Sequence, residues 1–341
     1  MAEISAYYKD ILAIYGCDLP WERLSGCNIL VTGATGLIGG CLTEALMMNP
    51  LRDYQVFASG RDESRLRHRF NKFQNDLGLR FLIMDVTSPL DCNYSFDYII
   101  HAASYAGPAA FTKMPVEVMR ANIDGVCNLI TYGMKNGMKR FLYLSSGEVY
   151  GESDGREFTE DYSGYVDCTS PRSCYPSSKR AAESLCSSYK AEYDVDVVIA
   201  RPCHTYGPYF SDTDNRVYAQ FIRNILNDQD IVMKSSGEQF RSWCYVVDCV
   251  SGLLHLLLKG ASGEAYNIAN PESNITIKEL ANTVAEIGGK NVVIVPPEQS
   301  ESAGYNPVNK SVYSIKKTKS LGWEPKTSLK TGFRHSIDEL R

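Results

Sequence analysis

The chain has 341 residues, of which 44% are hydrophobic and 22% charged, and its formal net charge is −5. These values are typical of an ordinary folded protein with room for one large α/β unit and a smaller lobe, and they exclude a disordered or fibrous architecture. The negative charge, and the lack of a Lys/Arg run interleaved with aromatic residues, exclude nucleic acid as an expected partner.

Cysteine usage and hydropathy indicate the compartment. The eleven cysteines are spread from Cys17 to Cys249 without a CxxC pair. An odd, scattered set predicts neither a disulfide framework nor a metal site, so we expect reduced thiols and no metal. Charged residues interrupt the apolar stretch of residues 1–16, and no apolar run approaches the about 20 residues of a membrane span. We therefore expect a soluble, cytoplasmic protein with no membrane partner.

The first predicted element is a helix over residues 4–15, where apolar side chains recur at helical spacing. We interpret residues 1–25 as an N-terminal helical arm that packs on the rest of the chain. From Asn28 onward the pattern changes to short apolar runs separated by amphipathic stretches. The runs that predict strands are 28–33, 54–60, 80–85, 96–103, 140–146 and 195–201.

The stretches between these runs predict crossover helices, notably at 37–48, 115–136 and 175–193. Near-continuous apolar strands suit a parallel sheet that is buried on both faces. Their alternation with helices therefore predicts an α/β fold with a Rossmann-type doubly wound parallel sheet, whose ligands bind at the carboxyl ends of the strands.

After Arg201 the regular alternation weakens, which predicts a smaller C-terminal substrate-binding lobe. Residues 201–217 are rich in Gly, Pro, Asp and Asn, residues 245–258 return toward the sheet, and a helix at 275–289 precedes a strand at 291–297. The predicted boundaries are an arm at 1–25, an NAD(P)-binding Rossmann domain at 26–200 and 240–270, and a substrate-binding lobe at 201–239 and 271–341.

A glycine-rich loop joins the first predicted strand to the helix after it. Its glycines are spaced so that the backbone can approach a pyrophosphate at the helix N-terminus, where free N–H groups and the helix dipole favour anions. The loop predicts a dinucleotide site; a mere strand-to-helix turn is the alternative. The residues predicted to bind the dinucleotide here are Gly33, Thr35, Gly36, Leu37, Ile38 and Gly39.

The end of the second strand bears on the choice between NADP and NAD. An acidic residue there would bind the ribose 2′-hydroxyl of NAD, but Gly60 ends the strand and Arg61 follows it. The guanidinium of Arg61 can bind a 2′-phosphate, which favours NADP. Alternatively Arg61 is merely exposed and Asp62 or Glu63 binds the NAD ribose. Asp85, after the third strand, is predicted either to meet the adenine or to cap a turn.

Tyr175 and Lys179 begin a predicted helix four residues apart, so both side chains lie on one helical face. We expect the lysine charge to favour tyrosinate and to lower the pKa of Tyr175, which would make the phenol a usable acid/base. Ser145 and Ser146 end the preceding strand, and Ser146 is predicted to hydrogen-bond the same substrate oxygen. Together with the upstream glycine loop, this set predicts an oxidoreductase-like active site.

These motifs resemble the extended short-chain dehydrogenase/reductases that act on nucleotide sugars. The resemblance covers Asn28 to 325, and its motifs are the glycine loop, SSGEVYG at 145–151, YPSSK at 175–179 and RPCHTYGP at 201–208. The pattern resembles UDP-glucuronate decarboxylases in particular. The segments that carry this likeness are HAASYAGPAAFTKMP at 101–115, EDYSGYVDCTSPRSCY at 160–175, SDTDNRV at 211–217 and EQFRSWCYVVD at 238–248.

The resemblance implies a reaction in three parts: hydride leaves carbon 4 of the sugar for the nicotinamide, the keto intermediate reacts, and hydride returns. Tyr175 would take the hydroxyl proton, Lys179 would hold the nicotinamide ribose, and Ser146 would orient the hydroxyl. Glu148 matches an additional acid of the decarboxylases and dehydratases, with an ordinary surface carboxylate as the alternative.

The resemblance also implies binding residues and a homodimer. Further cofactor contacts would come from Val86, Ala102, Ala103, Ser104, Asn122, Pro202 and His204. Further substrate contacts would come from Pro108, Gly147, His204, Arg216 and Arg241. The alternatives are plain salt bridges for the two arginines, which would otherwise clamp the nucleotide diphosphate, and a buried structural amide for Asn122. The predicted dimer pairs the helices at 115–136 and 175–193.

Three departures from the family pattern leave the reaction open. Gly60-Arg61 replaces the acidic pattern of the NAD-retaining decarboxylases, His204 stands where an asparagine usually contacts substrate, and Gly147 stands where glucose dehydratases carry an aspartate. The expected function is NAD(P)-dependent modification of a nucleotide-diphosphate sugar by a decarboxylase- or epimerase-like route. One alternative is a net NADPH-dependent reductase of a nucleotide-linked keto sugar, and another is a non-catalytic dinucleotide-binding sensor.

Overall fold

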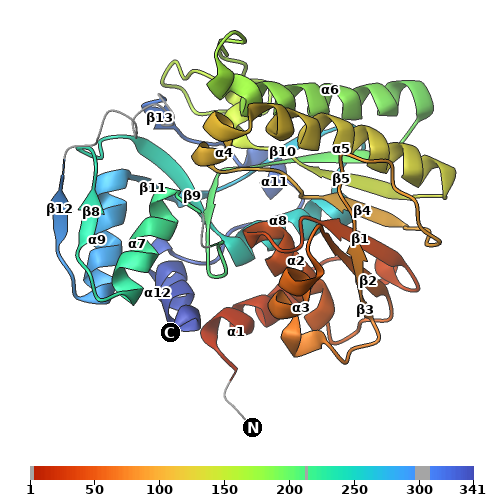
Figure 1. Cartoon of the computed structure of the whole chain (residues 1–341), viewed down its shortest axis with the longest axis horizontal. Helices are drawn as coiled ribbons and strands as arrows, with labels where there is room; N and C mark the ends of the chain where they lie inside the picture. The colour runs from red at the N-terminus through yellow and green to blue at the C-terminus, as the bar shows by residue number, and fades with distance from the viewer. Residues whose placement is uncertain (1–3, 212–213, 296–307) are drawn as a thin grey trace.

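The fold is built on one seven-stranded parallel sheet, seen in a computed structural model that describes residues 4–211, 214–295 and 308–341 (Figure 1). The strand order is β10-β6-β5-β4-β1-β2-β3, and every neighbouring pair is parallel. The strands are β1 (Asn28–Thr32), β2 (Gln55–Gly60), β3 (Leu79–Ile83), β4 (Tyr98–His101), β5 (Arg140–Leu144), β6 (Val197–Pro202) and β10 (Ala265–Ile268). The predicted doubly wound sheet and its six strands are confirmed, and β10 is an additional strand.

Helices cover both faces of this sheet (Figure 1). One face carries α2 (Leu37–Met48), α3 (Glu63–Arg69) and α8 (Val246–Lys259), and the other carries α4 (Pro108–Lys113), α5 (Pro115–Lys135) and α6 (Cys174–Tyr193). The three predicted crossover helices are α2, α5 and α6, each within one residue of its expected bounds. On α5 the buried residues recur every three or four positions, from Val118 to Gly133, as an amphipathic helix on a sheet requires.

Strand burial follows position in the sheet. In β1, β4 and β5 every residue is buried except the first residue of β1 and of β5, whereas β3 at the edge has no buried residue. The expectation that all six predicted strands are buried on both faces is therefore wrong for β3, because an edge strand has a neighbour on only one side. Within the described residues, no helix is long and apolar enough to cross a membrane.

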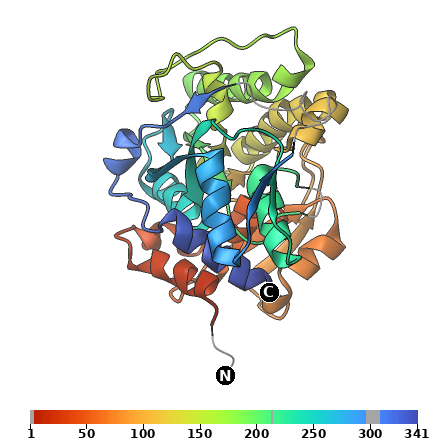
Figure 2. The ribbon, with the colours of Figure 1, turned by 90° about the vertical axis from the view of Figure 1, so that its left-hand side faces the viewer.

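After β6 the chain builds a smaller part, which is seen in Figure 2, and it returns to the large sheet where β10 pairs with β6. Its main sheet contains β7 (His204–Tyr206), β9 (Phe240–Tyr245), β11 (Asn270–Thr276) and β13 (Lys310–Ser311), and β8 (Ile231–Met233) pairs with β12 (Val292–Ile294). Its helices are α7 (Val217–Leu226), α9 (Ile277–Gly288), α11 (Lys316–Lys319) and α12 (Leu329–Leu340). The predicted strand at 291–297 is shorter, and its last two residues lie outside the described residues. β9 pairs here although the predicted boundaries assign it to the Rossmann domain; the boundaries themselves stay a prediction.

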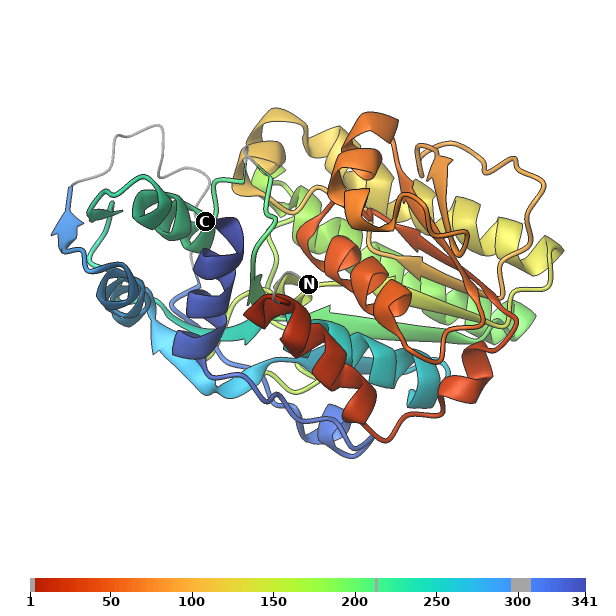
Figure 3. The ribbon, with the colours of Figure 1, turned by 90° about the horizontal axis from the view of Figure 1, so that it is seen from below.

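The N-terminal arm begins with α1 (Ala6–Ala13), which lies beside α2 and α12 (Figure 3). The phenols of Tyr7 and Tyr8 donate hydrogen bonds of 2.6 and 2.9 Å to the buried carboxylate of Glu44 on α2. Arg69 on α3 pairs with the same carboxylate. Since a buried charge needs hydrogen-bonded partners, these contacts hold the arm against the large sheet's helices.

Candidate active site

The predicted site residues gather at the carboxyl edge of the large sheet. The glycine loop follows β1, Arg61 follows β2, Asp85 and Val86 follow β3, and residues 102–104 follow β4. Ser146 follows β5, and Pro202 ends β6. In an open parallel sheet this edge is where ligands bind. The topology therefore brings together segments that are up to about half the chain apart.

In the glycine loop, backbone packs directly against backbone, so two of its positions have no space for a side chain. Such a tight strand-to-helix turn is what a dinucleotide-binding loop requires. Gly33 has φ +68°, and a Cβ on it would lie 2.7 Å from the Ala102 carbonyl oxygen. A Cβ on Gly39, in the first turn of α2, would lie 2.4 Å from the Gly33 carbonyl oxygen. The first N–H groups of α2 have no partner within the helix and point toward this loop. Thr35 and Gly36 complete the loop, and Leu37 and Ile38 open α2.

A buried hydroxyl beside the loop supports the same fit. The Oγ of Ser104, three residues after β4, is buried and has no hydrogen-bond partner among the described residues. The neighbouring Ala103 N–H donates a 3.3 Å hydrogen bond to Thr32 Oγ1, which holds this segment against β1. A buried hydroxyl without a partner is costly unless a ligand or water satisfies it. The residues at this edge therefore fit a bound dinucleotide.

The acidic residues near Arg61 have local partners, and Glu63 pairs with Arg67 one turn along α3. The Asp62 carboxylate accepts from the Arg65 N–H and caps α3, and the Asp85 carboxylate accepts from the Thr87 N–H at 2.9 Å. Asp85 therefore has the turn-capping role that was one of its two predicted roles. Arg61 is 56% exposed, its guanidinium lies 3.9 Å from Asp85, and it donates to the Tyr105 hydroxyl. Its charge is thus available at the end of β2.

Ser146, Tyr175 and Lys179 converge where β5 ends and α6 begins. Tyr175 and Lys179 lie in the first two turns of α6, and both are buried. Lys179 Nζ donates a 2.7 Å hydrogen bond to the Leu144 carbonyl at the end of β5 and lies 5.7 Å from the centroid of the Tyr175 ring. Ser146 caps the short helix η4 (Gly147–Tyr150), and its hydroxyl acts to lower the pKa of Tyr175. The predicted constellation is therefore assembled in space.

The expected effect of Lys179 on Tyr175 is wrong for the protein alone. Burial is the largest influence on the phenol and raises the pKa of Tyr175 to about 12, against smaller opposing effects of Ser146, Arg216 and Arg172. Burial also lowers the pKa of Lys179 to about 7, so near neutral pH the ammonium is only partly present. The sequence reasoning overlooked that desolvation disfavours both charged forms.

Glu148 forms an ion pair that the sequence reasoning missed. Both of its carboxylate oxygens accept from the guanidinium of Arg172, each at 3.0 Å. Arg172 lies in η5 (Pro171–Ser173), immediately before α6. The side chain of Glu148 is 25% exposed and that of Arg172 is 19% exposed. Glu148 is therefore not an ordinary surface carboxylate. A signal was present in the sequence, because Arg172 stands three residues before Tyr175.

Gly147 is a glycine because Tyr313 occupies the space beside it. A Cβ at this position would lie 2.0 Å from the Tyr313 hydroxyl oxygen. Tyr313 is buried, follows β13, and its hydroxyl accepts a 2.9 Å hydrogen bond from Ser311. An aspartate, as in the glucose dehydratases, has no room here. Nothing in the sequence pattern predicted this contact, because the two residues are 166 positions apart.

Two arginines and a histidine form the wall of the site on the smaller part. Arg241 on β9 is buried, its guanidinium donates to the carbonyls of Phe240 and Val308, and none of the described carboxylates pairs with it. Arg216 pairs with Asp214 at 2.5 Å, so the salt bridge that was its alternative role is formed. Arg241 is therefore the better candidate for a substrate anion.

His204 at the start of β7 lies in the field of both arginines. Its buried Nδ1 has no hydrogen-bond partner among the described residues, and its ring centroid lies 5.3 Å from that of Trp243. Burial, then the charges of Arg241 and Arg216, lower the pKa of His204 to about 3. A neutral imidazole with a free ring nitrogen can hydrogen-bond a ligand without adding charge.

The other predicted binding residues described here, Asn122, Pro108 and Val86, make contacts that stabilise the fold. Asn122 on α5 donates to the Val118 carbonyl and to Ser178 Oγ, each at 3.0 Å, so it joins α5 to α6 as a buried amide, and only its Oδ1 lacks a partner among the described residues. Pro108 is the first residue of α4. Val86 is buried, and its carbonyl accepts from Asn128.

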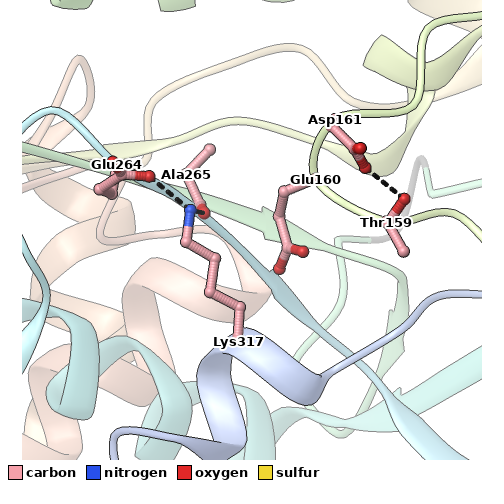
Figure 4. Close-up of a pocket in the computed structure, with 6 residues that line it drawn as sticks. All are labelled: Thr159, Glu160, Asp161, Glu264, Ala265 and Lys317. Atoms are coloured by element: carbon pink, nitrogen blue, oxygen red, sulfur yellow. Dashed lines mark hydrogen bonds and ion pairs between the residues drawn. The ribbon is translucent and has the colours of Figure 1, made fainter.

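A hollow of about 390 Å³ lies away from this site, at the β10 edge of the large sheet (Figure 4). Lys317 crosses it and donates to Glu264 at 2.6 Å and to the Ala265 carbonyl at 2.7 Å. Glu160 accepts from the Asn267 N–H on β10. The hollow contains none of the predicted site residues, and Lys317 is neutralised there by its ion pair with Glu264, so we assign it no catalytic role.

Comparisons with known proteins agree with this geometry. The sequence profile described as the NAD dependent epimerase/dehydratase family matches residues 29–269. UDP-glucuronic acid decarboxylase 6 of Arabidopsis thaliana is 34% identical over 317 residues, which are 93% of this chain and 90% of that protein. UDP-glucuronic acid decarboxylase 1 of Xenopus tropicalis is 31% identical over 92% of this chain and 72% of its own length.

Among solved structures, the chain is similar to UDP-glucose 4-epimerase from Thermotoga maritima, determined with UDP-glucose. The TM-score is 0.78 at 27% identity, and the match covers 92% of this chain and 98% of that one. The similarity therefore extends over both the large sheet and the smaller part.

Proposed function

Because the chain belongs to the NAD dependent epimerase/dehydratase family, we propose that it remodels the sugar of a nucleotide-diphosphate sugar through a 4-keto intermediate. As a member of this family the protein is an enzyme that uses a nicotinamide dinucleotide and modifies a nucleotide sugar. The observation that carries the finer proposal is the convergence of Ser146, Tyr175 and Lys179 at the same sheet edge as a glycine loop that leads into the N-terminus of α2.

The side chains suggest how the first step is performed. When bound, the nicotinamide supplies an acceptor and donor of hydride. The Tyr175 oxygen takes the proton of the sugar hydroxyl, Ser146 orients that hydroxyl, and Lys179 favours the tyrosinate when it is protonated. Burial excludes water from the phenol, which strengthens each of these interactions. Arg172 fixes the carboxylate of Glu148, which would exchange a proton when the keto intermediate reacts.

The smaller part supplies groups suited to a nucleotide diphosphate. Arg241 is a buried cation without a carboxylate partner in the described chain, and an arginine fork matches phosphate geometry. The free Nδ1 of His204 adds a hydrogen-bonding group on the same wall. Decarboxylation of a nucleotide-linked glucuronate is the reaction we propose first, because relatives matched over more than 90% of the chain are named as UDP-glucuronic acid decarboxylases.

The experiment that tests the proposal combines cofactor and substrate identification. The purified enzyme is denatured, the released nucleotide is identified by chromatography, and the enzyme is then incubated with UDP, CDP, GDP and dTDP sugars. Copurified NAD with formation of a pentose nucleotide and carbon dioxide from UDP-glucuronate supports the proposal. Absence of turnover with every nucleotide sugar, with and without added NAD or NADP, contradicts it.

A net reductase is the second candidate, and Arg61 is the observation that favours it. Its exposed guanidinium at the end of β2 can bind a 2′-phosphate. The nearby acids have local partners, because Asp62 and Asp85 cap turns and Glu63 pairs with Arg67. With external NADPH the same side chains would reduce the keto group of a nucleotide-linked keto sugar to a hydroxyl, and the product is a deoxysugar only where the keto sugar already lacks an oxygen at another carbon. Consumption of one NADPH per product distinguishes this route from a redox-neutral one.

Arg61→Ala is expected to weaken NADP binding about tenfold or more while changing NAD binding little. The reason is that only NADP carries the 2′-phosphate that the Arg61 guanidinium would bind. Calorimetric titration with each dinucleotide measures both constants. Arg65→Ala, on the first turn of α3, is the control for loss of a nearby surface charge. Equal effects of Arg61→Ala on NADP and NAD would remove the 2′-phosphate role.

We also propose a homodimer through α5 and α6. These two helices pack side by side on one face of the sheet, and α5 exposes Val116, Met119 and Met134. Exposed apolar side chains on a helix pair are typical of an interface. Light scattering at micromolar concentration should give twice the chain mass of 38.0 kDa. A monomeric mass, unchanged by Met119→Glu, would exclude this interface.

A cytoplasmic location is the remaining part of the proposal. All eleven cysteines lie in the described residues and none forms a disulfide. Such a set is usual for proteins of a reducing compartment. Fluorescence microscopy of the tagged full chain, or cell fractionation, measures the location directly.

A further inference from the structure

We propose that Arg172 is a positioning residue that fixes the Glu148 carboxylate and neutralises its charge beside the phenol of Tyr175. The inference rests on the function proposed above, since it concerns the same site. It assigns a role to a residue that neither the sequence motifs nor the family resemblance singled out.

The first observation is the geometry of the ion pair. Two different nitrogens of the Arg172 guanidinium, Nη1 and Nη2, each lie 3.0 Å from a different oxygen of Glu148. Such a two-point contact fixes the orientation of a carboxylate, which a single-point cation does not. The two side chains are 19% and 25% exposed, so solvent screens the pair less than it screens an exposed one.

The second observation is that Arg172 and Tyr175 both contact the ring of Phe111. The guanidinium carbon lies 4.7 Å from the centroid of the Phe111 ring on α4. The same ring stacks on Tyr175 with a centroid distance of 4.7 Å and an interplanar angle of 23°. Arg172 therefore contacts the carboxylate directly and the tyrosine through one buried ring.

The third observation is the balance of charges around the phenol. The groups that face Tyr175 are Ser146 and Glu148 from η4, Arg216 before α7, Arg172 from η5, Lys179 on its own helix, and Tyr143 on β5. Burial raises the pKa of Tyr175 most, Glu148 raises it further, and Ser146, Arg216 and Arg172 lower it. The negative charge of Glu148 opposes formation of tyrosinate, and its partner cation Arg172 offsets that opposition.

A direct role in substrate binding is the competing explanation. The Nε of Arg172 is buried and has no hydrogen-bond partner among the described residues. Its other two nitrogens are both engaged by Glu148. A positioning role predicts that loss of Arg172 affects turnover and its pH dependence but not substrate affinity, whereas a binding role predicts the reverse.

The test measures kcat against pH for Arg172→Met, Glu148→Gln and the double variant, with the substrate established for the wild type. Loss of the cation raises the pKa of Tyr175, so the rise of kcat with pH should move about one unit toward higher pH in Arg172→Met. Loss of the carboxylate should move it in the opposite direction. The double variant should return close to the wild-type position.

Two further variants separate charge from geometry. Arg172→Lys keeps the charge without the fork, so it should restore the position of the pH profile but leave kcat reduced, by about tenfold. Arg120→Met is the control, since this arginine pairs with Asp124 on the exposed face of α5, and it should match the wild type. Substrate Kd is measured by calorimetry in a Tyr175→Phe background, where turnover is blocked, and should be unchanged by Arg172→Met.

Three results would overturn the inference: an unmoved pH profile in Arg172→Met, shifts of the same sign in Arg172→Met and Glu148→Gln, or a substrate Kd raised more than about tenfold. If the wild type converts no nucleotide sugar, the function proposed above fails at that step. The inference is then decided by a double-mutant cycle of unfolding free energy for Arg172→Met and Glu148→Gln, where zero coupling overturns it.

Discussion

Tyr175→Phe is expected to lower kcat by about 100- to 10,000-fold, because it removes the oxygen that takes the sugar hydroxyl proton in the proposed mechanism. The aromatic ring is retained, and with it the stack on Phe111 at 4.7 Å. Helix α6 keeps its first turn, and Lys179 keeps its 2.7 Å hydrogen bond to the Leu144 carbonyl. Dinucleotide binding and the free energy of unfolding should therefore change little.

Three measurements check this prediction. Steady-state kinetics give kcat and KM, calorimetric titration gives the dinucleotide Kd, and urea denaturation gives the free energy of unfolding. Tyr165→Phe is the matched control, since this tyrosine is 64% exposed and lies outside the site. Retained turnover in Tyr175→Phe would remove the phenol from the mechanism. A large loss of stability would show that the effect on kcat is structural.

Gly39→Ala is expected to weaken dinucleotide binding by about tenfold or more, although alanine is the better helix former by about 1 kcal/mol. The new Cβ would lie 2.4 Å from the Gly33 carbonyl oxygen and 2.9 Å from the Gly33 carbonyl carbon. Both contacts are with backbone, which cannot rotate away as a side chain can. The loop must move, and with it the surface that approaches the pyrophosphate.

The free energy of unfolding of Gly39→Ala should fall by about 1–3 kcal/mol, the usual cost of overpacking. Gly16→Ala is the control, because nothing lies within 4 Å of the position its Cβ would take. Calorimetry with NAD and urea denaturation measure the two effects. If Gly39→Ala binds NAD as tightly as the wild type, the close approach of backbone in this loop is not what builds the cofactor site.

The glycine loop shows which features can be predicted from a short stretch of sequence. We could predict the strand before the loop, the helix after it and the role of its glycines from sequence alone. A buried parallel strand and a helix N-terminus each have a characteristic pattern within a few residues. The bounds of α2 were predicted to the residue. The likeness to nucleotide-sugar enzymes was readable for the same reason, because its motifs are short and continuous.

Predictions that depended on electrostatic balance were less successful. The four-residue spacing of Tyr175 and Lys179 correctly predicted that both lie at one end of a helix, but not that burial would raise one pKa to about 12 and lower the other to about 7. Desolvation depends on how many atoms surround a group, and a spacing rule does not contain that number. The capping role of Asp85 and the salt bridge of Arg216 were likewise only alternatives until their neighbours were known.

The sequence by itself determined six strands of the large sheet, three of its crossover helices, the glycine loop and the place of Tyr175 and Lys179 at the start of one helix, because each depends on residues near one another along the chain. Only the tertiary structure decided that Arg172 holds Glu148, that Tyr313 keeps position 147 free of a side chain, and that Arg241 is buried without a partner among the described carboxylates. The physical reason is that these contacts join distant segments. Their energies are set by burial and distance in the folded chain, neither of which is a property of any short stretch of sequence.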